Sequence, residues 1–281
     1  MKKDIMQPYF FVPASKIDKL STIDIESNID IIIDFEDSII NMKKSEYLLQ
    51  LSELPLIDDY WLRIPIREGF EDDIDIEFLT EVSLIGVNKI VIPKLKNQKE
   101  LKYIISKFPN FLFIILLEHP NFLFEIEDFI REENVLKERI KGLGLGSHDL
   151  ATFMGFSSSN VGMDYPKMRL LYLCKANSIP FIDVASMNIH EELVFIDELI
   201  NGFDLGVDGK FLIHPNQLSW LRNFSYKKKN EKLKWAKSLM SKLPHDYILN
   251  NIEPFIFENI VVEKPHILRA LNIIKKNKNG K

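Results

Sequence analysis

The segment FLFIILLEHP, residues 111–120, indicates the fold class more clearly than any other stretch of the chain. Its first seven residues are all apolar and include aromatic and β-branched side chains, which is typical of a strand buried on both faces of a parallel sheet. Glu118 follows this run directly. A carboxylate at such a position is costly to bury unless it lies beside a cation or a metal ion.

Similar apolar runs recur along the chain and predict strands at residues 9–12, 30–35, 60–64, 89–92, 111–117, 140–145, 180–184 and 210–213. Segments with apolar residues at helical spacing lie between them, at 45–54, 97–108, 122–138, 167–178 and 191–200. Strands that alternate with helices predict right-handed βαβ units, and eight such units predict an α/β fold of the closed (β/α)₈ TIM-barrel type. The length of 281 residues suits that fold, whereas a doubly wound open sheet is the alternative that periodicity leaves open.

Composition indicates which classes of partner and which cellular compartment to expect. The net charge of −5 gives no electrostatic reason to expect nucleic acid as a partner. Cys174 is the only cysteine, so an intrachain disulfide is excluded and a reducing cytoplasm is the expected location. The first residues carry no apolar stretch of signal-peptide length, and apolar runs elsewhere are too short to cross a bilayer, so no membrane partner is expected.

Polar and charged residues stand at the ends of most of the predicted strands. In a barrel these ends meet on one rim, where the loops that follow the strands build the active site. One such residue alone is more simply explained as a helix cap or an ion-pair partner, but their recurrence favours a shared site. The residues are Asp34, Glu36, Asp37, Arg63, Lys94, Glu118, His148, Asp149, Asp183 and His214.

Three glycines, Gly142, Gly144 and Gly146, alternate with leucine in the sixth predicted strand. Their spacing differs from the GxGxxG pattern of dinucleotide-binding loops, and no acidic residue ends a following strand at the expected distance. We interpret the segment as a flexible strand end at which the backbone approaches a ligand.

Eight strings in the same order resemble the citrate lyase β-subunit / malyl-CoA lyase family of metal-dependent TIM-barrel lyases and aldolases. YFFVPAS resembles the family's LFVPGS, IIIDFEDSI resembles ILDLEDAV, and WLRIP resembles its RIN-bearing strand. VIPKLK, LLEHPNF and GLGLGSHDLATFMG resemble VLPKVE, LIET-x-x-G and GxxFGxxDLxxxLG. GVDGKFLIHPNQ resembles GFDGKxxIHPxQ, and NIVVEKPHILRA resembles a C-terminal form that ends in MIDxPxxxRA.

The resemblance implies roles for individual residues. Glu118 and Asp149 would bind one metal ion, with Mg²⁺ expected and Mn²⁺ as the alternative. Arg63 would hold a substrate carboxylate or an enolate oxygen. Glu36 and Asp37 would orient Arg63 or metal-bound water, and Asp37 is expected to act in catalysis. The remaining assignments place Gly146, Ser147 and His148 at the substrate, Lys16 and Lys19 at coenzyme A phosphates, and Glu263 at a neighbouring subunit's site as a proton donor or acceptor.

The expected activity is therefore carbon–carbon bond cleavage in a β-hydroxyacyl-CoA such as a citryl-, malyl- or citramalyl-CoA, in a homotrimer or hexamer. Residues 1–222 would form the catalytic barrel, and residues 223–281 a helical extension that contributes to oligomer contacts and covers the active site. Four departures from the family leave the substrate open. Ala14 replaces glycine and Pro65 replaces asparagine. His119-Pro120-Asn121-Phe122 replaces a segment with a small residue and glycine, and Glu263 replaces aspartate.

Two other functions stay open. The first is a coenzyme A-independent aldolase that acts on 2-oxo acids such as pyruvate. That branch carries a D-x-E-H pattern after the second strand, whereas this chain has Asp37 in place of the histidine, which favours the CoA-dependent reaction. The second is a non-catalytic relative that keeps the barrel as a binding module, against which the presence of Glu118, Asp149 and Arg63 argues.

Overall fold

The computed structural model describes residues 6–22, 28–36, 44–53, 59–133, 135–157, 161–244, 249 and 252–279. The chain divides into two compact units, residues 1–221 and 222–281. The sequence placed this division one residue later, between 222 and 223.

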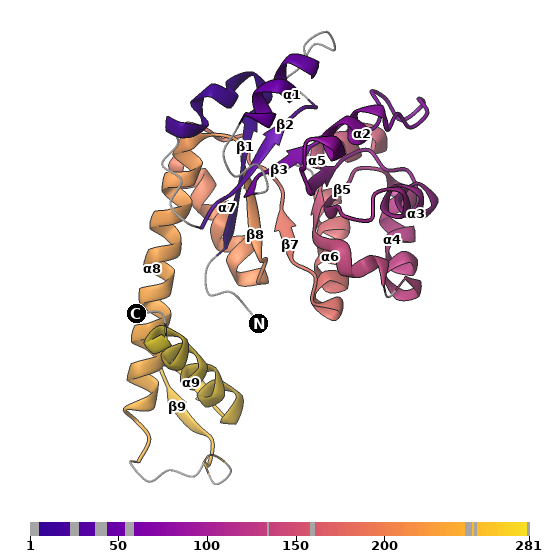
Figure 1. The fold of residues 1–281 in the computed structure, drawn as a ribbon. Helices are drawn as coiled ribbons and strands as arrows, with labels where there is room; N and C mark the ends of the chain where they lie inside the picture. The colour runs from indigo at the N-terminus through magenta and orange to yellow at the C-terminus, as the bar shows by residue number, and fades with distance from the viewer. Residues whose placement is uncertain are drawn as a thin grey trace. The chain divides into compact units, whose positions relative to one another are not determined.

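The first unit is a closed barrel of eight parallel strands in chain order, with helices outside it (Figure 1). This confirms the expected (β/α)₈ fold and excludes the open sheet. Two strands have the expected bounds, and the others differ by one or two residues at one or both ends. The strands are β1 (Gln7–Pro13), β2 (Asp30–Asp34), β3 (Trp61–Arg63), β4 (Lys89–Ile92), β5 (Leu112–Leu117), β6 (Ile140–Leu145), β7 (Phe181–Asp183) and β8 (Gly209–Leu212).

The helices depart from expectation in two respects. Helices α2 and α5 were not expected, and the helix expected over residues 122–138 ends at Glu132 and is followed by the short 3₁₀ helix η4 (Leu136–Arg139). The 3₁₀ helix η1 (Ala14–Thr22) follows β1. The α-helices of this unit are α1 (Lys44–Ser52), α2 (Glu77–Leu84), α3 (Gln98–Lys107), α4 (Pro120–Glu132), α5 (Ser147–Met154), α6 (Asp164–Asn177), α7 (Glu192–Leu205) and the start of α8 (Pro215–Met240).

One buried cluster draws side chains from seven of the strands and fills the barrel interior; its members are Tyr9, Ile32, Trp61, Val91, Ile114, Leu116, Ile182 and Phe211. The remaining strand, β6, contributes glycines instead. A Cβ atom at Gly142 would overlap Ile182, and one at Gly144 would overlap Phe211. We therefore correct the interpretation of this segment as flexible: β6 is a regular strand, and its glycines leave room for larger side chains opposite them.

The second unit contains the later part of α8, the antiparallel hairpin of β9 (Phe255–Phe257) and β10 (Ile260–Val262), and α9 (Lys264–Asn279). Glu258 and Asn259 connect the two strands with φ of 49° and 62°, which is the backbone of a tight hairpin turn. Its small core contains Ala236, Leu239, Phe257, Val262, Ile267 and Ala270. Across the described part of the whole chain, no helix combines the length and the apolar character that crossing a membrane requires.

Candidate active site

Glu118 lies at the end of β5, where the chain passes into α4, and only 2% of its surface is exposed. Its Oε2 accepts a 2.7 Å hydrogen bond from the backbone N–H of Lys94. Burial, and then the negative charges of Glu36 and Asp149, raise the pKa of Glu118 well above its usual range, against the opposing effects of the Lys94 amide and the Arg63 charge. Several carboxylates thus converge on one buried position.

Asp149 reaches this position from the first turn of α5, which starts directly after β6. Its side chain is exposed, and its charge acts on both Glu118 and Lys94. The backbone of Gly146 lies against the Glu118 side chain, since a Cβ atom at residue 146 would overlap it. Gly146 and Ser147 are half-buried and His148 is exposed, so the expected substrate contacts form the rim beside Asp149.

Arg63, at the end of β3, is held by two acids from β2 and the residues after it. Its Nε and Nη2 donate to the two carboxylate oxygens of Asp34 at 2.7 and 2.6 Å. Its Nη1 lies 2.9 Å from Oε2 of Glu36. The guanidinium carbon lies 4.8 Å from the centre of the Phe11 ring, which fixes the plane of the group. The structure thus places Glu36 against Arg63, which is one of the two contacts that the family resemblance implied for Glu36.

Lys94, which follows β4 and Pro93, connects Glu118 with Glu36, a role that was not predicted for it. Its backbone has a φ of 54°, which is unusual for a residue other than glycine. Its ammonium lies 3.1 Å from Oε1 of Glu36 and donates to the carbonyl of Glu68 at 2.8 Å. Burial lowers the pKa of Lys94, but the charge and hydrogen bond of Glu36, with the charges of Asp149 and Glu118, outweigh this and raise it.

His119, the residue after Glu118, belongs to a cluster of three aromatic rings. The His119 ring lies 5.1 Å from that of Phe70 and 4.6 Å from that of Phe153, which is four residues after Asp149 on α5. The Nδ1 atom of His119 accepts a hydrogen bond from the backbone N–H of Asn121 and so caps α4. The segment in which this chain departs most from the family pattern therefore combines a helix cap with an aromatic cluster beside the site.

For the other expected site residues, the structure describes only some of the positions. Lys16 is exposed in η1, while for Lys19 only the backbone is described. Asp37 lies outside the described residues. Glu263 belongs to the second unit, where it is exposed before α9 and its N–H donates to Nδ1 of His266.

Asp183, expected on the rim, is wrongly placed by the sequence. Ile182 points into the barrel, and Asp183 points outward, where it pairs with Lys167 on α6 and with Lys210 on β8. Asp34 also differs from expectation, because it contacts Arg63 directly; its position at the end of β2 was the available signal.

The residues present fit a divalent cation. Glu118 is buried among negative charges, and a cation between it and Asp149 would offset their repulsion. Within the described ranges, no group of three or more His, Cys, Asp or Glu side chains is arranged to hold a metal. Two carboxylates suit Mg²⁺, which keeps several positions for water and for substrate oxygens.

A family model for HpcH/HpaI aldolase/citrate lyase matches residues 7–215. The mitochondrial citramalyl-CoA lyase of Homo sapiens is 24% identical over 289 residues, covering 94% of this chain and 83% of that protein. The (3S)-malyl-CoA thioesterase of Cereibacter sphaeroides is 24% identical over 215 residues, covering 74% of this chain and 73% of that protein.

Solved structures show the same fold. The Mycobacterium tuberculosis protein CitE in complex with magnesium, acetoacetate and coenzyme A superposes with a TM-score of 0.76 at 18% identity, covering 96% of this chain and 97% of that one. RipC from Yersinia pestis has a TM-score of 0.62 at 23% identity, covering 79% and 95%.

Proposed function

This chain belongs to the HpcH/HpaI aldolase/citrate lyase family, and from this membership we infer its function. It is a carbon–carbon lyase of the aldolase type. The reaction is the Mg²⁺-dependent cleavage of a β-hydroxyacyl-CoA, and the substrate class is that of citramalyl-CoA and malyl-CoA, which are named in its relatives. The single observation that carries this proposal is the convergence of Glu118, Asp149 and Arg63 on one rim of the barrel.

Glu118 and Asp149 are the proposed metal ligands. The metal ion, when bound, stabilises negative charge on the oxygen of the reacting carbonyl group. The Lys94 amide orients Glu118 by holding one of its carboxylate oxygens, and Gly146 keeps the space that the Glu118 side chain occupies. These contacts support a site whose geometry is set before a cation arrives.

Arg63 is the proposed partner of the substrate carboxylate or of the developing enolate. Asp34 holds one edge of the guanidinium and Phe11 packs against its face, so the group is oriented with little freedom to turn. In the cleavage, a carboxylate takes up the hydroxyl proton, and the hydroxyl-bearing carbon becomes the carbonyl carbon of a 2-oxo acid as its bond to the methylene breaks. The electron pair of the broken bond forms the thioester enolate. That enolate then takes up a proton, for which Asp37 and Glu263 are the proposed acids.

Coenzyme A phosphates are proposed to meet Lys16 and Lys19 in the segment after β1. The exposure of Lys16 supports this assignment. A homotrimer or hexamer is the proposed assembly, since Glu263 is assigned to a neighbour's site. A cytoplasmic location is proposed because the sole cysteine, Cys174, is a buried free thiol.

The test is a cleavage assay on the purified chain with Mg²⁺ and three substrates: citramalyl-CoA, malyl-CoA, and a 4-hydroxy-2-oxo acid without coenzyme A. Formation of acetyl-CoA with pyruvate or glyoxylate, abolished by EDTA and restored by Mg²⁺, is the expected result. Turnover of the free acid alone would establish the CoA-independent aldolase instead. The variants Glu118→Gln and Asp149→Asn should lose Mg²⁺ binding in calorimetry, whereas Glu192→Gln, an exposed acid on α7, should bind as the parent does.

A further inference from the structure

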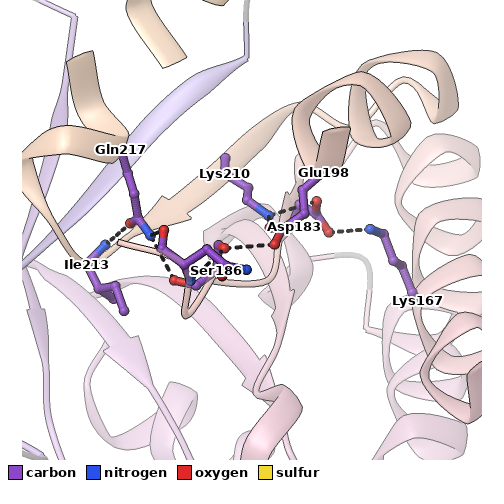
Figure 2. Close-up of polar contacts among 8 residues, drawn as sticks. Lys167, Asp183, Ser186, Glu198, Lys210, Ile213 and Gln217 are labelled. Carbon is purple, nitrogen blue, oxygen red and sulfur yellow. Dashed lines mark hydrogen bonds and ion pairs between the residues drawn. The ribbon is translucent and has the colours of Figure 1, made fainter. Parts of the chain in front are cut away.

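A second buried polar cluster lies between β7, β8 and the helices outside them, away from the metal ligands. We call it the β7–β8 network and define it as Lys167, Asp183, Ser186, Glu198, Lys210 and Gln217. Four of these side chains, those of Asp183, Ser186, Lys210 and Gln217, belong to residues that are at most 3% exposed. Figure 2 shows the network as a chain of contacts that runs from Lys167 on α6 to Gln217 on α8.

Gln217 connects two loops of the rim through its side-chain amide. Its Oε1 accepts from the backbone N–H of Ile213, just after β8. Its Nε2 donates to the carbonyls of Ser186 and Asn188, just after β7, at 2.8 and 3.0 Å. A fully buried amide with this many backbone partners fixes both loops, because each lost bond would leave a buried polar group unpaired.

Ser186 extends the network to the ion pairs. Its hydroxyl donates to Oε1 of Glu198 and accepts from the backbone N–H of Asn188. The other oxygen of Glu198 lies 3.2 Å from Nζ of Lys210, which lies 3.3 Å from Asp183. Asp183 in turn pairs with Lys167 at 2.7 Å. Buried ion pairs add little net stability to a fold. We therefore assign these pairs the role of holding the segment after β7 in one conformation.

The segment that follows β7 starts at the end of the barrel where the carboxyl ends of the strands meet, which we call the mouth. Ala185 packs against the interior cluster, as does Phe11. The Phe11 ring lies 5.4 Å from that of Phe211 and 4.8 Å from the Arg63 guanidinium. Because β3 and β7 are four strands apart in the closed barrel, Ala185 lies across the mouth from Arg63.

We propose that Gln217, Ser186 and Glu198 are positioning residues, which hold Ala185 as the wall of the substrate site that faces Arg63. The inference rests on the proposed function and adds to it a specificity-determining position, Ala185. It also gives a role to the lysine and glutamine of GVDGKFLIHPNQ. Lys210 and Gln217 hold the loop after β7 in place and do not contact the substrate themselves.

Gln217→Leu keeps the size of the side chain and removes its hydrogen bonds. Its expected effect is a loss in kcat/KM of about 10-fold or more, carried by a higher KM, because a small displacement of a positioning group is costly. Mg²⁺ affinity should stay within about twofold of the parent, since the proposed ligands follow β5 and β6 and lie away from Gln217. Backbone amides of the loop after β7 should exchange hydrogen faster. The matched control is Gln50→Leu, an exposed glutamine on α1, which should leave all three readouts unchanged.

Ser186→Ala and Ser186→Thr keep the proposal testable if Gln217→Leu does not fold. The first should reproduce the higher KM, and the second, which restores a hydroxyl, should recover it. Ala185→Leu should abolish discrimination between citramalyl-CoA and malyl-CoA or block both. If the parent is active and either Gln217→Leu or Ser186→Ala has the KM of the parent, this inference is overturned while the proposed function stands. A parent without turnover would overturn the proposed function first and this inference with it.

Discussion

The backbone amide of Lys94 donates a 2.7 Å hydrogen bond to Oε2 of Glu118 from a left-handed conformation with a φ of 54°. Such a backbone costs a non-glycine residue roughly 1–2 kcal/mol. Lys94→Gly should therefore be more stable than Lys94→Ala by about 1 kcal/mol, because both variants lose the ammonium and only alanine keeps the strain. Urea unfolding measures this difference. Equal stabilities would show that the conformation is not strained.

Gly146→Ala should weaken Mg²⁺ binding about 10-fold or more, since the added methyl group would displace the Glu118 side chain. Isothermal titration calorimetry with MgCl₂ measures the change in affinity. Gly155→Ala is the control: Gly155 ends α5 with a φ of 72° and has open space around its Cβ position, so alanine should cost about 1 kcal/mol of stability and leave Mg²⁺ binding unchanged. Unchanged binding in Gly146→Ala would contradict the assignment of Glu118 as a ligand.

Arg63→Lys should lower kcat about 100-fold, because a lysine cannot reproduce the two parallel hydrogen bonds that Asp34 accepts. Steady-state kinetics with citramalyl-CoA measures the effect. Arg131→Lys, an exposed arginine on α4, should have the kcat of the parent. An Arg63→Lys variant with full activity would remove the proposed role of the guanidinium.

Asp183 should make the stability depend on pH in the acid range. Burial raises its pKa, but the charges of Lys210 and Lys167, with hydrogen bonds from Lys167 and the Val184 amide, outweigh burial and lower it below 3.8. The stabilisation is therefore complete above the unfolded-state pKa and is lost as pH falls through the folded-state value.

Accordingly, the parent should lose more stability than Asp183→Asn between about pH 5 and about pH 3 in urea titrations. At neutral pH the variant should be destabilised by about 3 kcal/mol, because buried Lys210 loses one of its anionic partners. Asp204→Asn, which changes an exposed acid on α7, should follow the parent at every pH. Parallel curves for the parent and Asp183→Asn would contradict the lowered pKa.

Glu263 should act across subunits if the proposed assembly is correct. Glu263→Gln and Glu118→Gln should each be inactive, whereas a mixed oligomer of the two should regain part of the activity, since some sites then combine intact Glu118 with an intact Glu263 from a neighbour. Dissociation, mixing and reassembly, followed by the citramalyl-CoA assay, measures this. Mixtures that stay inactive would place Glu263 and Glu118 of the same chain in one site, or Glu263 outside any site.

Much of the barrel could be predicted from the sequence because buried parallel strands have a strong pattern. The runs around Ile90 and Leu143 gave strand bounds that match the structure. Helices α2 and α5 were missed because they are short, at eight residues each. The helix expected to reach residue 138 stops early, since Glu133 has a non-helical backbone and closes α4 with a hydrogen bond to Phe129.

The candidate site likewise has a part that the sequence could predict and a part that it could not. A polar residue that ends an apolar strand is visible in the sequence, and this was enough to single out Glu118 and Arg63. The face toward which a strand-end side chain points is harder to read, because a shift of one residue moves it from the barrel mouth to the surrounding helices. Asp183 was misjudged for this reason. The role of Lys94 depends on its φ angle and on its backbone amide, neither of which a side-chain pattern reveals.

The glycines of β6 have a consequence for how this chain can change over evolutionary time. Gly144 is small because the Phe211 ring occupies the space beside it, and Gly142 stands in the same relation to Ile182. Each pair should therefore vary together among homologues: a larger residue at 144 should accompany a smaller one at 211. A substitution at one member alone would have to pass through an overfilled or a hollow intermediate, so the two positions constrain each other's history.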